Sequence, residues 1–340
     1  MTYQPVTKFF ALALDPIHVG TGGMRLGRVD MSIVREPGTN LPKIPGTSIA
    51  GACRTYAAMQ EEGKFPGCAG QGGHCGDPNC PICVTFGFSK GSGASFQGLA
   101  QFSDARLLFF PVHSLAGPVW VTCPEVLKDL GITVDDDPAD EQVRVAQGVK
   151  RPKKDEPERE GEPDEQVRVA QGVKQGGRLN LGWLMLEVAG SVSLDGQLSA
   201  IPDDIKKRAV LVSDKMFGHI VNDNLEVRTS VSIDPQTGAA AEGALFTYEA
   251  LPRASVLYFE VVVSDPKYYR IARTVEKNGK KETESVIPLS DKEHSDGDID
   301  KVKSTVNNGL KLFETLGIGG MNTRGMGRLR VLNLSAGGAQ

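Results

Sequence analysis

Four cysteines crowded into one short segment form the group best suited to chemistry in this sequence. They are Cys68, Cys75, Cys80 and Cys83 in the stretch PGCAGQGGHCGDPNCPIC, where the last two form a C-x2-C pair. Thiolates at this spacing, separated by glycine, proline, asparagine and aspartate, suit tetrahedral zinc, and His74 is an alternative ligand for one of them. Residues 63–90 are therefore predicted to be a cysteine-rich insert that binds structural zinc. Disulfides and unliganded thiols are the alternatives.

A single acidic residue, Asp30, lies among glycines and basic residues near the N-terminus. A lone carboxylate beside basic residues can hold a divalent metal ion or take part in acid–base chemistry on a phosphate. From spacing alone, the simpler interpretation is a surface aspartate that ends a turn. His18, beside the first glycines, is open to two interpretations, a packed histidine or a catalytic one.

Two segments are predicted to present backbone N–H groups to a phosphate-bearing partner. In the first, IPGTS leads into a helix that Thr47 or Ser48 can cap, and the first N–H groups of the helix form an anion site. The second is GIGGMNTRGMGRL, residues 317–329, which carries Arg324. Neither loop contains a nucleotide-binding fingerprint, so the pattern favours a polyanion over a nucleotide. Tight turns that join a helix to a strand are the structural alternative.

The distribution of charge is compatible with such a partner, although the whole chain has a net charge of -4. Residues 135–165 contain twelve acidic and six basic residues, which leaves the rest of the chain near +2. The acidic segment belongs to a predicted surface insertion, residues 133–178. It contains DEQVRVAQGVK twice, at 140–150 and 164–174. Two copies are too few for a solenoid, so an extended insertion is favoured over a functional repeat array.

The pattern of strands with intervening helices that must position these residues predicts an α+β fold for this chain of 340 residues. The predicted strands cover residues 9–14, 31–35, 100–110, 119–123, 183–193, 256–264 and 329–334, and the predicted helices cover 48–62, 206–222 and 299–316. Residues 267–298, rich in lysine and other charged residues, are predicted to be an exposed loop. No apolar run is long enough to cross a membrane, and the N-terminus lacks the pattern of a signal peptide. We therefore expect a cytoplasmic protein with no membrane partner.

Several of these motifs, in this order, resemble the RAMP superfamily of type III CRISPR–Cas effectors. The similar stretches are LDPIHVGTGG, GRVDMSIVREPGTNLPKIPGTSIAGACR, FSDARLLFFPVHSLAGPVWVTCP, RTSVSIDPQTGAAAEGALFTYEALP and GIGGMNTRGMGRL. Among subtypes, the chain is most similar to the backbone subunit of Cmr-type (III-B) complexes, with the Csm-type subunit second.

The resemblance implies a fold and a set of partners. The fold would be a single RAMP domain over residues 1–340: a modified RNA-recognition-motif, ferredoxin-like palm. The cysteine-rich insert would be a zinc knuckle in a finger, and residues 226–252 a β-hairpin thumb. Copies would stack head to tail along a guide RNA (crRNA) with other type III Cas subunits, and the thumbs would interrupt the guide–target RNA duplex.

The resemblance also implies an activity and its residues. Asp30 would be the catalytic residue of an endoribonuclease that cuts target RNA by attack of a ribose 2′-hydroxyl on the adjacent phosphate, with Mg²⁺ or Mn²⁺ as the divalent metal. The implied guide-RNA contacts are Lys43, Ser48, Arg54, Gly319, Gly320 and Arg324. A non-catalytic subunit that only binds crRNA, or an endoribonuclease that processes the guide, are the alternative functions.

Overall fold

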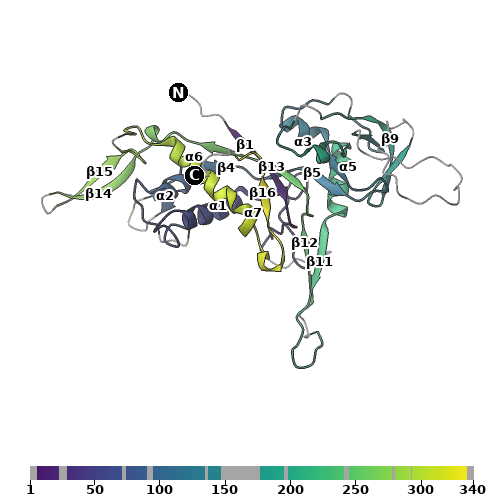
Figure 1. Cartoon of the computed structure of the whole chain (residues 1–340), viewed down its shortest axis with the longest axis horizontal. Helices are drawn as coiled ribbons and strands as arrows, with labels where there is room; N and C mark the ends of the chain where they lie inside the picture. Colours follow the sequence, from purple (N-terminus) through teal and green to yellow (C-terminus); the bar gives the residue numbers. More distant parts are fainter. Residues whose placement is uncertain are drawn as a thin grey trace. The chain divides into compact units, whose positions relative to one another are not determined.

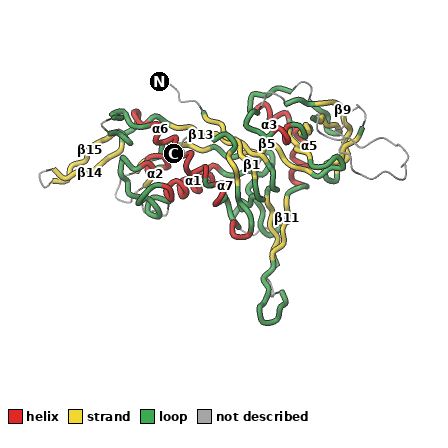
Figure 2. Tube along the Cα trace, viewed as in Figure 1, coloured by secondary structure: helices red, strands yellow, loops and turns green. Residues whose placement is uncertain are grey.

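The computed structural model describes residues 6–22, 29–70, 74–89, 95–134, 137–146, 177–194, 198–240, 245–277, 280–291 and 293–334. The chain divides into two compact units. The first contains residues 1–19, 44–106 and 258–340, and the second contains residues 20–43 and 107–257. Both units combine helices with strands (Figure 2), so the chain is a mixed α+β protein, as predicted.

The first unit is built from both ends of the chain (Figure 1). Its strands are β1 (Thr7–Ala13), β2 (Phe88–Ser89), β3 (Ser95–Phe96), β4 (Ala100–Phe102), β13 (Val256–Val263), β14 (Ile271–Lys277), β15 (Lys280–Val286) and β16 (Leu329–Val331). Its helices are α1 (Gly46–Gln60), α2 (Pro81–Phe86), α6 (Ile299–Lys311) and α7 (Phe313–Leu316), with 3-10 turns η1 (Pro266–Tyr268) and η2 (Asn322–Arg324). The sheet order is β16-β1-β13, and β4 pairs antiparallel with β13. The β1–β16 pair is antiparallel, so the two ends of the chain close one sheet.

Helix α6 forms where the predicted apolar spacing places it. The Asp298 side chain caps it by accepting the Lys301 N–H at 2.9 Å, and Val302, Val306 and Leu310 are buried along one face. Gly317, at φ 76°, follows the end of α7, as the sequence predicts. Helices α1 and α6 pack against each other within this unit.

The second unit contains β5 (Arg106–Val112), β6 (Val119–Thr122), β7 (Gln142–Val145), β8 (Arg178–Leu181), β9 (Leu184–Ser191), β10 (Ala209–Leu211), β11 (Glu226–Ser230) and β12 (Phe246–Ala250). Its helices are α3 (Pro124–Asp129), α4 (Asp203–Lys206) and α5 (Asp214–Asp223). The main sheet is mixed, in the order β5-β6-β10-β7-β9-β8. Strands β11 and β12 form a separate antiparallel hairpin, with Glu226 opposite Ala250 and Ser230 opposite Phe246.

Four sequence predictions differ from the observed elements. The strand predicted over residues 100–110 is divided into β4 and β5. The helix predicted over residues 206–222 is interrupted by β10, whose three residues are buried in the sheet. The loop predicted over residues 267–298 contains the antiparallel β14–β15 hairpin, in which Ile271 lies opposite Val286. Residues 31–35 make isolated bridges instead of a continuous strand.

The predicted acidic insertion contributes to the core at one end. Strand β7, inside the first copy of the repeated sequence, pairs with β10 and β9, and buries Val143 and Val145. The second copy, residues 164–174, lies outside the described residues. A search of the part of the chain that the structure describes finds no helix long and apolar enough to span a membrane.

Candidate functional site

Asp30 lies where the segment after the first glycine loop runs beside strand β12. The Met31 N–H donates to the Thr247 carbonyl at 3.1 Å, and the Glu249 N–H donates to the Met31 carbonyl at 3.0 Å. Met31 and Tyr248 thereby form an isolated parallel β-bridge. Two parts of the chain that are 217 residues apart in sequence are therefore joined at the β11–β12 hairpin.

The Asp30 carboxylate is held by one residue of this strand. The Thr247 N–H donates to Asp30 Oδ2 at 2.7 Å, and the Thr247 hydroxyl donates to the same oxygen at 3.0 Å. In return, the Asp30 N–H donates to Thr247 Oγ1 at 3.2 Å. The bonds from the Thr247 backbone and hydroxyl lower the pKa of Asp30 below its ordinary value, so the side chain is ionised at neutral pH. Within the described part of the chain, Oδ1 accepts no hydrogen bond.

An ion pair anchors the same segment five residues further on. Arg35 Nη2 lies 2.9 Å from Glu249 Oε2, which also accepts the Ile33 N–H at 3.4 Å. Arg35 Nη1 donates to the Asn222 side chain of helix α5. Both charged side chains are largely buried, at 20% and 10% exposure, and removing either one would leave a poorly solvated charge. The backbone carrying Asp30 is thus attached to β12 on both sides of Met31.

The four predicted cysteines converge in the first unit. Their sulfur atoms all lie within 4.8 Å of one another, and together they could hold a metal ion. Cys75 Sγ is 3.6 Å from Cys83 Sγ, and Cys80 Sγ is 3.9 Å from Cys68 Sγ. Tetrahedral zinc with Zn–S bonds of about 2.3 Å separates sulfurs by about 3.8 Å, so the observed spacing fits that ion.

The environment of the thiols also suits a closed, structural metal site. Cys68, Cys80 and Cys83 are buried, and Cys75 is exposed. Hydrogen bonds from the neighbouring thiols, that of Cys80 first, lower the pKa of Cys83 below its ordinary value. Helix α2 begins directly after Cys80, with Pro81 at its first position, and it carries Cys83.

Arg54, a predicted RNA contact, instead faces this cysteine loop. Its Nε donates to the Cys68 carbonyl and its Nη1 to the Gly87 carbonyl, both at 2.8 Å, and Nη2 lies 2.7 Å from His74 Nδ1. All three guanidinium nitrogens are therefore engaged within the protein. This geometry favours a structural role for Arg54 over a phosphate contact. The bond to Nη2 also turns His74 toward Arg54, while the group that could hold a metal ion consists of the four cysteines.

A substitution of Arg54 tests this structural role. Arg54→Lys should lower the free energy of unfolding by about 2 kcal/mol, because an ammonium group cannot make three bonds in the plane of a guanidinium. Urea denaturation of the purified protein measures this change. Arg270→Lys is the matched control, since Arg270 is exposed and also donates to main-chain carbonyls, those of Lys267 and Tyr269. Equal effects of the two substitutions would contradict the assignment.

The predicted cap of helix α1 is wrong, and another residue takes its place. Pro45 occupies the N-cap position, and no side chain at that position caps the helix. Instead, Asp104 Oδ1 accepts the Gly46 N–H at 2.8 Å. A side chain at position 46 would lie 2.4 Å from the Phe102 carbonyl, so glycine is required for this close approach. Part of the predicted anion site is thus filled by a carboxylate of the protein. Ser48 is half-buried in the first turn.

The second glycine loop packs against the start of the first one. The Gly320 N–H donates to the His18 carbonyl at 2.8 Å and is therefore not free for a phosphate. Gly319 has φ 86°, and a Cβ there would lie 2.4 Å from the same carbonyl. His18 is buried, whereas Gly319, Gly320 and Arg324 are exposed. The Tyr56 hydroxyl donates to the Gly317 carbonyl at 2.7 Å, which attaches this loop to helix α1.

The predicted site residues are distributed over both units. Asp30 and the half-buried Lys43 belong to the second unit, whereas Ser48, Arg54 and the second glycine loop belong to the first. Sequence reasoning missed Asp104 and Thr247. An aspartate or threonine within a strand-rich region carries no local signal for the distant backbone that it contacts.

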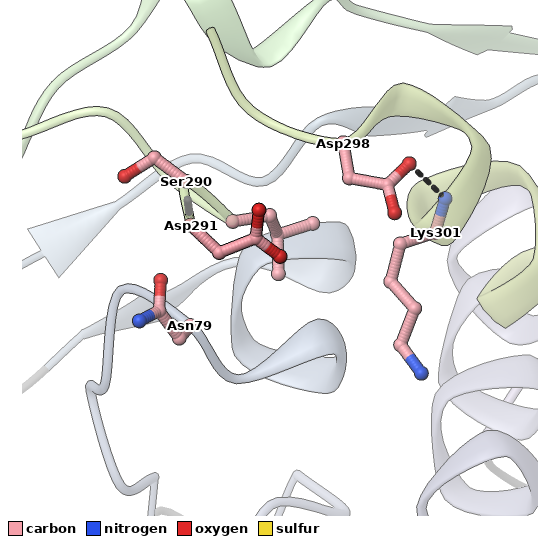
Figure 3. A pocket seen from close by; sticks show the side chains of 6 residues that line it. Asn79, Ser290, Asp291, Asp298 and Lys301 are labelled. Carbon is pink, nitrogen blue, oxygen red and sulfur yellow. Dashed lines mark hydrogen bonds between the residues drawn. The ribbon is translucent and has the colours of Figure 1, made fainter. Parts of the chain in front are cut away.

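A cavity of about 240 Å³ lies beside the cysteine loop in the first unit (Figure 3). Its lining residues are Asn79, Leu289, Ser290, Asp291, Asp298 and Lys301. Asp298 is engaged as the cap of α6, and Asp291 Oδ1 accepts the N–H groups of Glu293 and His294 at 2.8 and 2.6 Å. The two aspartates that line the cavity therefore stabilise the surrounding loop and helix end.

The sequence profile of the RAMP superfamily matches residues 11–330. A relative from Pyrococcus furiosus, the CRISPR system Cmr endoribonuclease Cmr4, is 27% identical over 264 residues, which cover 74% of this chain and 79% of the relative.

Solved structures show the same fold. The type III-B Cmr-beta structure bound to cognate target RNA contains a chain with a TM-score of 0.59 and 14% identity, and the match covers 98% of this chain and 99% of that chain. Oligomeric Cmr4 from Pyrococcus furiosus has a TM-score of 0.54 and 18% identity, with coverage of 96% and 98%.

Proposed function

Because this chain belongs to the RAMP superfamily, we propose that it is a backbone subunit of a type III CRISPR effector that binds crRNA and cleaves complementary target RNA. The observation that carries this proposal is the Asp30 carboxylate, ionised and held on one oxygen beside strand β12 of the β11–β12 hairpin. The relative named as a Cmr endoribonuclease supports the same activity.

The elements of the fold take roles in this proposal. A modified RNA-recognition-motif, ferredoxin-like palm carries the cysteine loop as part of a finger, and the β11–β12 hairpin is the thumb. Exposed Val227, Val231 and Ile233 on this hairpin provide an apolar surface suited to contact with bases. Further copies of the chain and other type III Cas subunits complete the particle, as the oligomeric state named for the Pyrococcus furiosus structure suggests.

Guide RNA is held through its backbone, while base pairing supplies sequence specificity. The proposed contacts are Lys43, Ser48, Gly319, Gly320 and Arg324. Gly319 and Gly320 are exposed at this loop and carry no side chain that would block a phosphate, although the Gly320 N–H itself is bound to the His18 carbonyl. Exposed Arg324 adds a positive charge beside them. Arg54 is excluded from this set because its guanidinium is engaged at the cysteine loop.

Cleavage proceeds by attack of a ribose 2′-oxygen on the adjacent phosphorus. The bond from phosphorus to the 5′-oxygen breaks, the 2′-hydroxyl loses its proton, and the leaving 5′-oxygen gains one. Asp30 orients the 2′-hydroxyl through Oδ1 and would be the residue that holds a divalent metal ion, and a base displaced by the hairpin gives the in-line geometry. A strand flexible enough to turn its ribose is required, which explains why the cut would fall where the duplex is interrupted.

A divalent cation fits this site only with help from the substrate. Mg²⁺ is commonly bound by one or two carboxylates together with phosphate oxygens and water, and Asp30 Oδ1 supplies one such oxygen. Among the described residues, Asp30 belongs to no group of three or more carboxylates, histidines or cysteines that could hold a metal ion. When bound, Mg²⁺ or Mn²⁺ would supply Lewis-acid stabilisation of the phosphate charge.

The cysteine cluster has a separate, structural role in this proposal. Four thiolates leave no open position for a substrate, so zinc there holds the finger loop and does not take part in cleavage. Arg54 complements the negative charge of a Zn(Cys)4 site and ties the loop to helix α1.

The ends of the cleaved RNA test the reaction. Complexes assembled with crRNA should cut complementary RNA at regular intervals and leave 2′,3′-cyclic phosphate and 5′-hydroxyl ends. Mass spectrometry of the fragments identifies these groups. In addition, the 5′ fragments should resist ligation at their 3′ ends, which the cyclic phosphate blocks, unless a phosphatase removes it first. A non-complementary RNA of equal length is the control. Products with 5′-phosphate ends would contradict 2′-hydroxyl attack.

A further inference from the structure

We infer that Thr247 is a positioning residue for Asp30: its hydroxyl fixes the rotation of the carboxylate so that Oδ2 is held and Oδ1 is left for the RNA. This inference rests on the proposed function, in which Asp30 is the catalytic residue. Thr247 itself touches Asp30 and is assigned no contact with the reacting atoms.

The bonds form a closed arrangement around one carboxylate oxygen. Thr247 donates twice to Asp30 Oδ2, through its backbone at 2.7 Å and its hydroxyl at 3.0 Å. Its Oγ1 also accepts the Asp30 N–H at 3.2 Å, so one hydroxyl binds both the backbone and the side chain of Asp30. A carboxylate bound by a single N–H can swivel about that bond. A second donor from a different direction restricts this motion.

The backbone of Thr247 is itself well fixed, which a positioning residue requires. Its strand β12 pairs with β11, where Thr229 lies directly opposite. The Thr247 carbonyl accepts the Met31 N–H, so the residue contacts the Asp30–Met31 segment from three of its atoms. The Arg35–Glu249 ion pair holds the same two strands of backbone further along.

No other described charged group competes for this carboxylate. On the paired strand, Arg228 Nε is engaged with Glu226 Oε1 at 2.6 Å. Arg35, on the segment that carries Asp30, is engaged with Glu249 of β12. The orientation of the Asp30 carboxylate therefore depends on Thr247. Loss of the Thr247 hydroxyl should change the position of Oδ1.

Two substitutions at position 247 separate the hydroxyl from the shape of the side chain. Thr247→Val keeps the branched shape and the backbone N–H but removes the hydroxyl, whereas Thr247→Ser keeps the hydroxyl. The readout is the single-turnover cleavage rate of target RNA bound at saturation by purified, crRNA-loaded complexes, together with the Kd for target RNA. Only assembled complexes are measured. A variant that folds poorly therefore gives fewer complexes, but the rate constant of those complexes can still be compared.

We expect Thr247→Val to slow cleavage by roughly ten- to a hundredfold without changing the Kd, because a misplacement of about 1 Å at a reacting group can cost about a hundredfold. Thr247→Ser should restore the rate to within about threefold of the original protein. Thr39→Val is a closely matched control. The Thr39 hydroxyl donates to Glu36 Oε2 at 3.1 Å and accepts the Leu41 N–H at 3.3 Å, outside the proposed site.

Two results would overturn the inference. One is an unchanged cleavage rate in Thr247→Val, and the other is an equal loss in Thr247→Ser and Thr247→Val, which would assign the effect to packing. Asp30→Ala, measured in parallel, separates this inference from the proposed function. If Asp30→Ala cuts normally, the proposed function itself fails; if only Asp30→Ala is inactive, the positioning role alone fails.

Discussion

Complexes carrying Asp30→Ala should bind crRNA and target RNA normally yet cut the target roughly 10²- to 10⁴-fold more slowly, the range for loss of one positioned acid–base group. The carboxylate is ionised because two bonds from Thr247 lower its pKa, and its Oδ1 accepts no hydrogen bond from the described residues. The substitution removes the charge while leaving the Met31–β12 backbone bonds in place. Single-turnover assays with labelled target RNA measure the rate, and filter binding measures both affinities.

A matched carboxylate elsewhere in the same unit serves as the control. Asp140 accepts a hydrogen bond from the Ser213 hydroxyl at 2.8 Å, much as Asp30 does from Thr247, and its pKa is also lowered, chiefly by Lys215. Asp140→Ala should cut target RNA at the original rate. Regular cuts of normal intensity in Asp30→Ala would assign the chain a purely structural, crRNA-binding role.

The second large effect concerns the thiol cluster. Purified protein should contain about one zinc ion per chain, and Cys80→Ser should remove it and lower the free energy of unfolding by more than about 4 kcal/mol. Cys80 is fully buried among the other three thiols, so its loss leaves an incomplete set of ligands around a buried site. Elemental analysis and chemical denaturation measure the two changes.

Cys123→Ser separates metal loss from the cost of altering any buried thiol. Cys123 is buried in the second unit, outside the cluster, and burial raises the pKa of its thiol well above the ordinary value. It should retain the full zinc content with a smaller loss of stability. A zinc-free protein whose four clustered thiols react freely under native conditions would refute the site.

The parts of the protein that sequence reasoning described best depend on neighbours close in the chain. The four cysteines fall within sixteen residues, and short glycine- and proline-rich turns suffice to bring their sulfurs within 4.8 Å of one another. Helix α6 follows an apolar spacing and a capping aspartate that are both local. The α+β class was predictable for the same reason.

The differences between expectation and structure concern residues whose partners lie far away in sequence. Residues 206–222 have helical composition at both ends, yet Ala209–Leu211 joins a buried sheet whose other strands come from distant segments. Arg54 looks like a free cation in a basic stretch, but the folded chain brings Cys68 and Gly87 carbonyls to it. Propensity and charge do not encode such pairings.

The candidate site shows the same division. By itself, the sequence determined the residue types: a lone aspartate, a thiol quartet and two glycine loops. Only the tertiary structure decided that Thr247 binds Asp30 across 217 residues, and that Asp104 binds the first N–H of helix α1. Ligand spacing is a property of a short segment, whereas the orientation of a carboxylate depends on backbone that folding brings beside it.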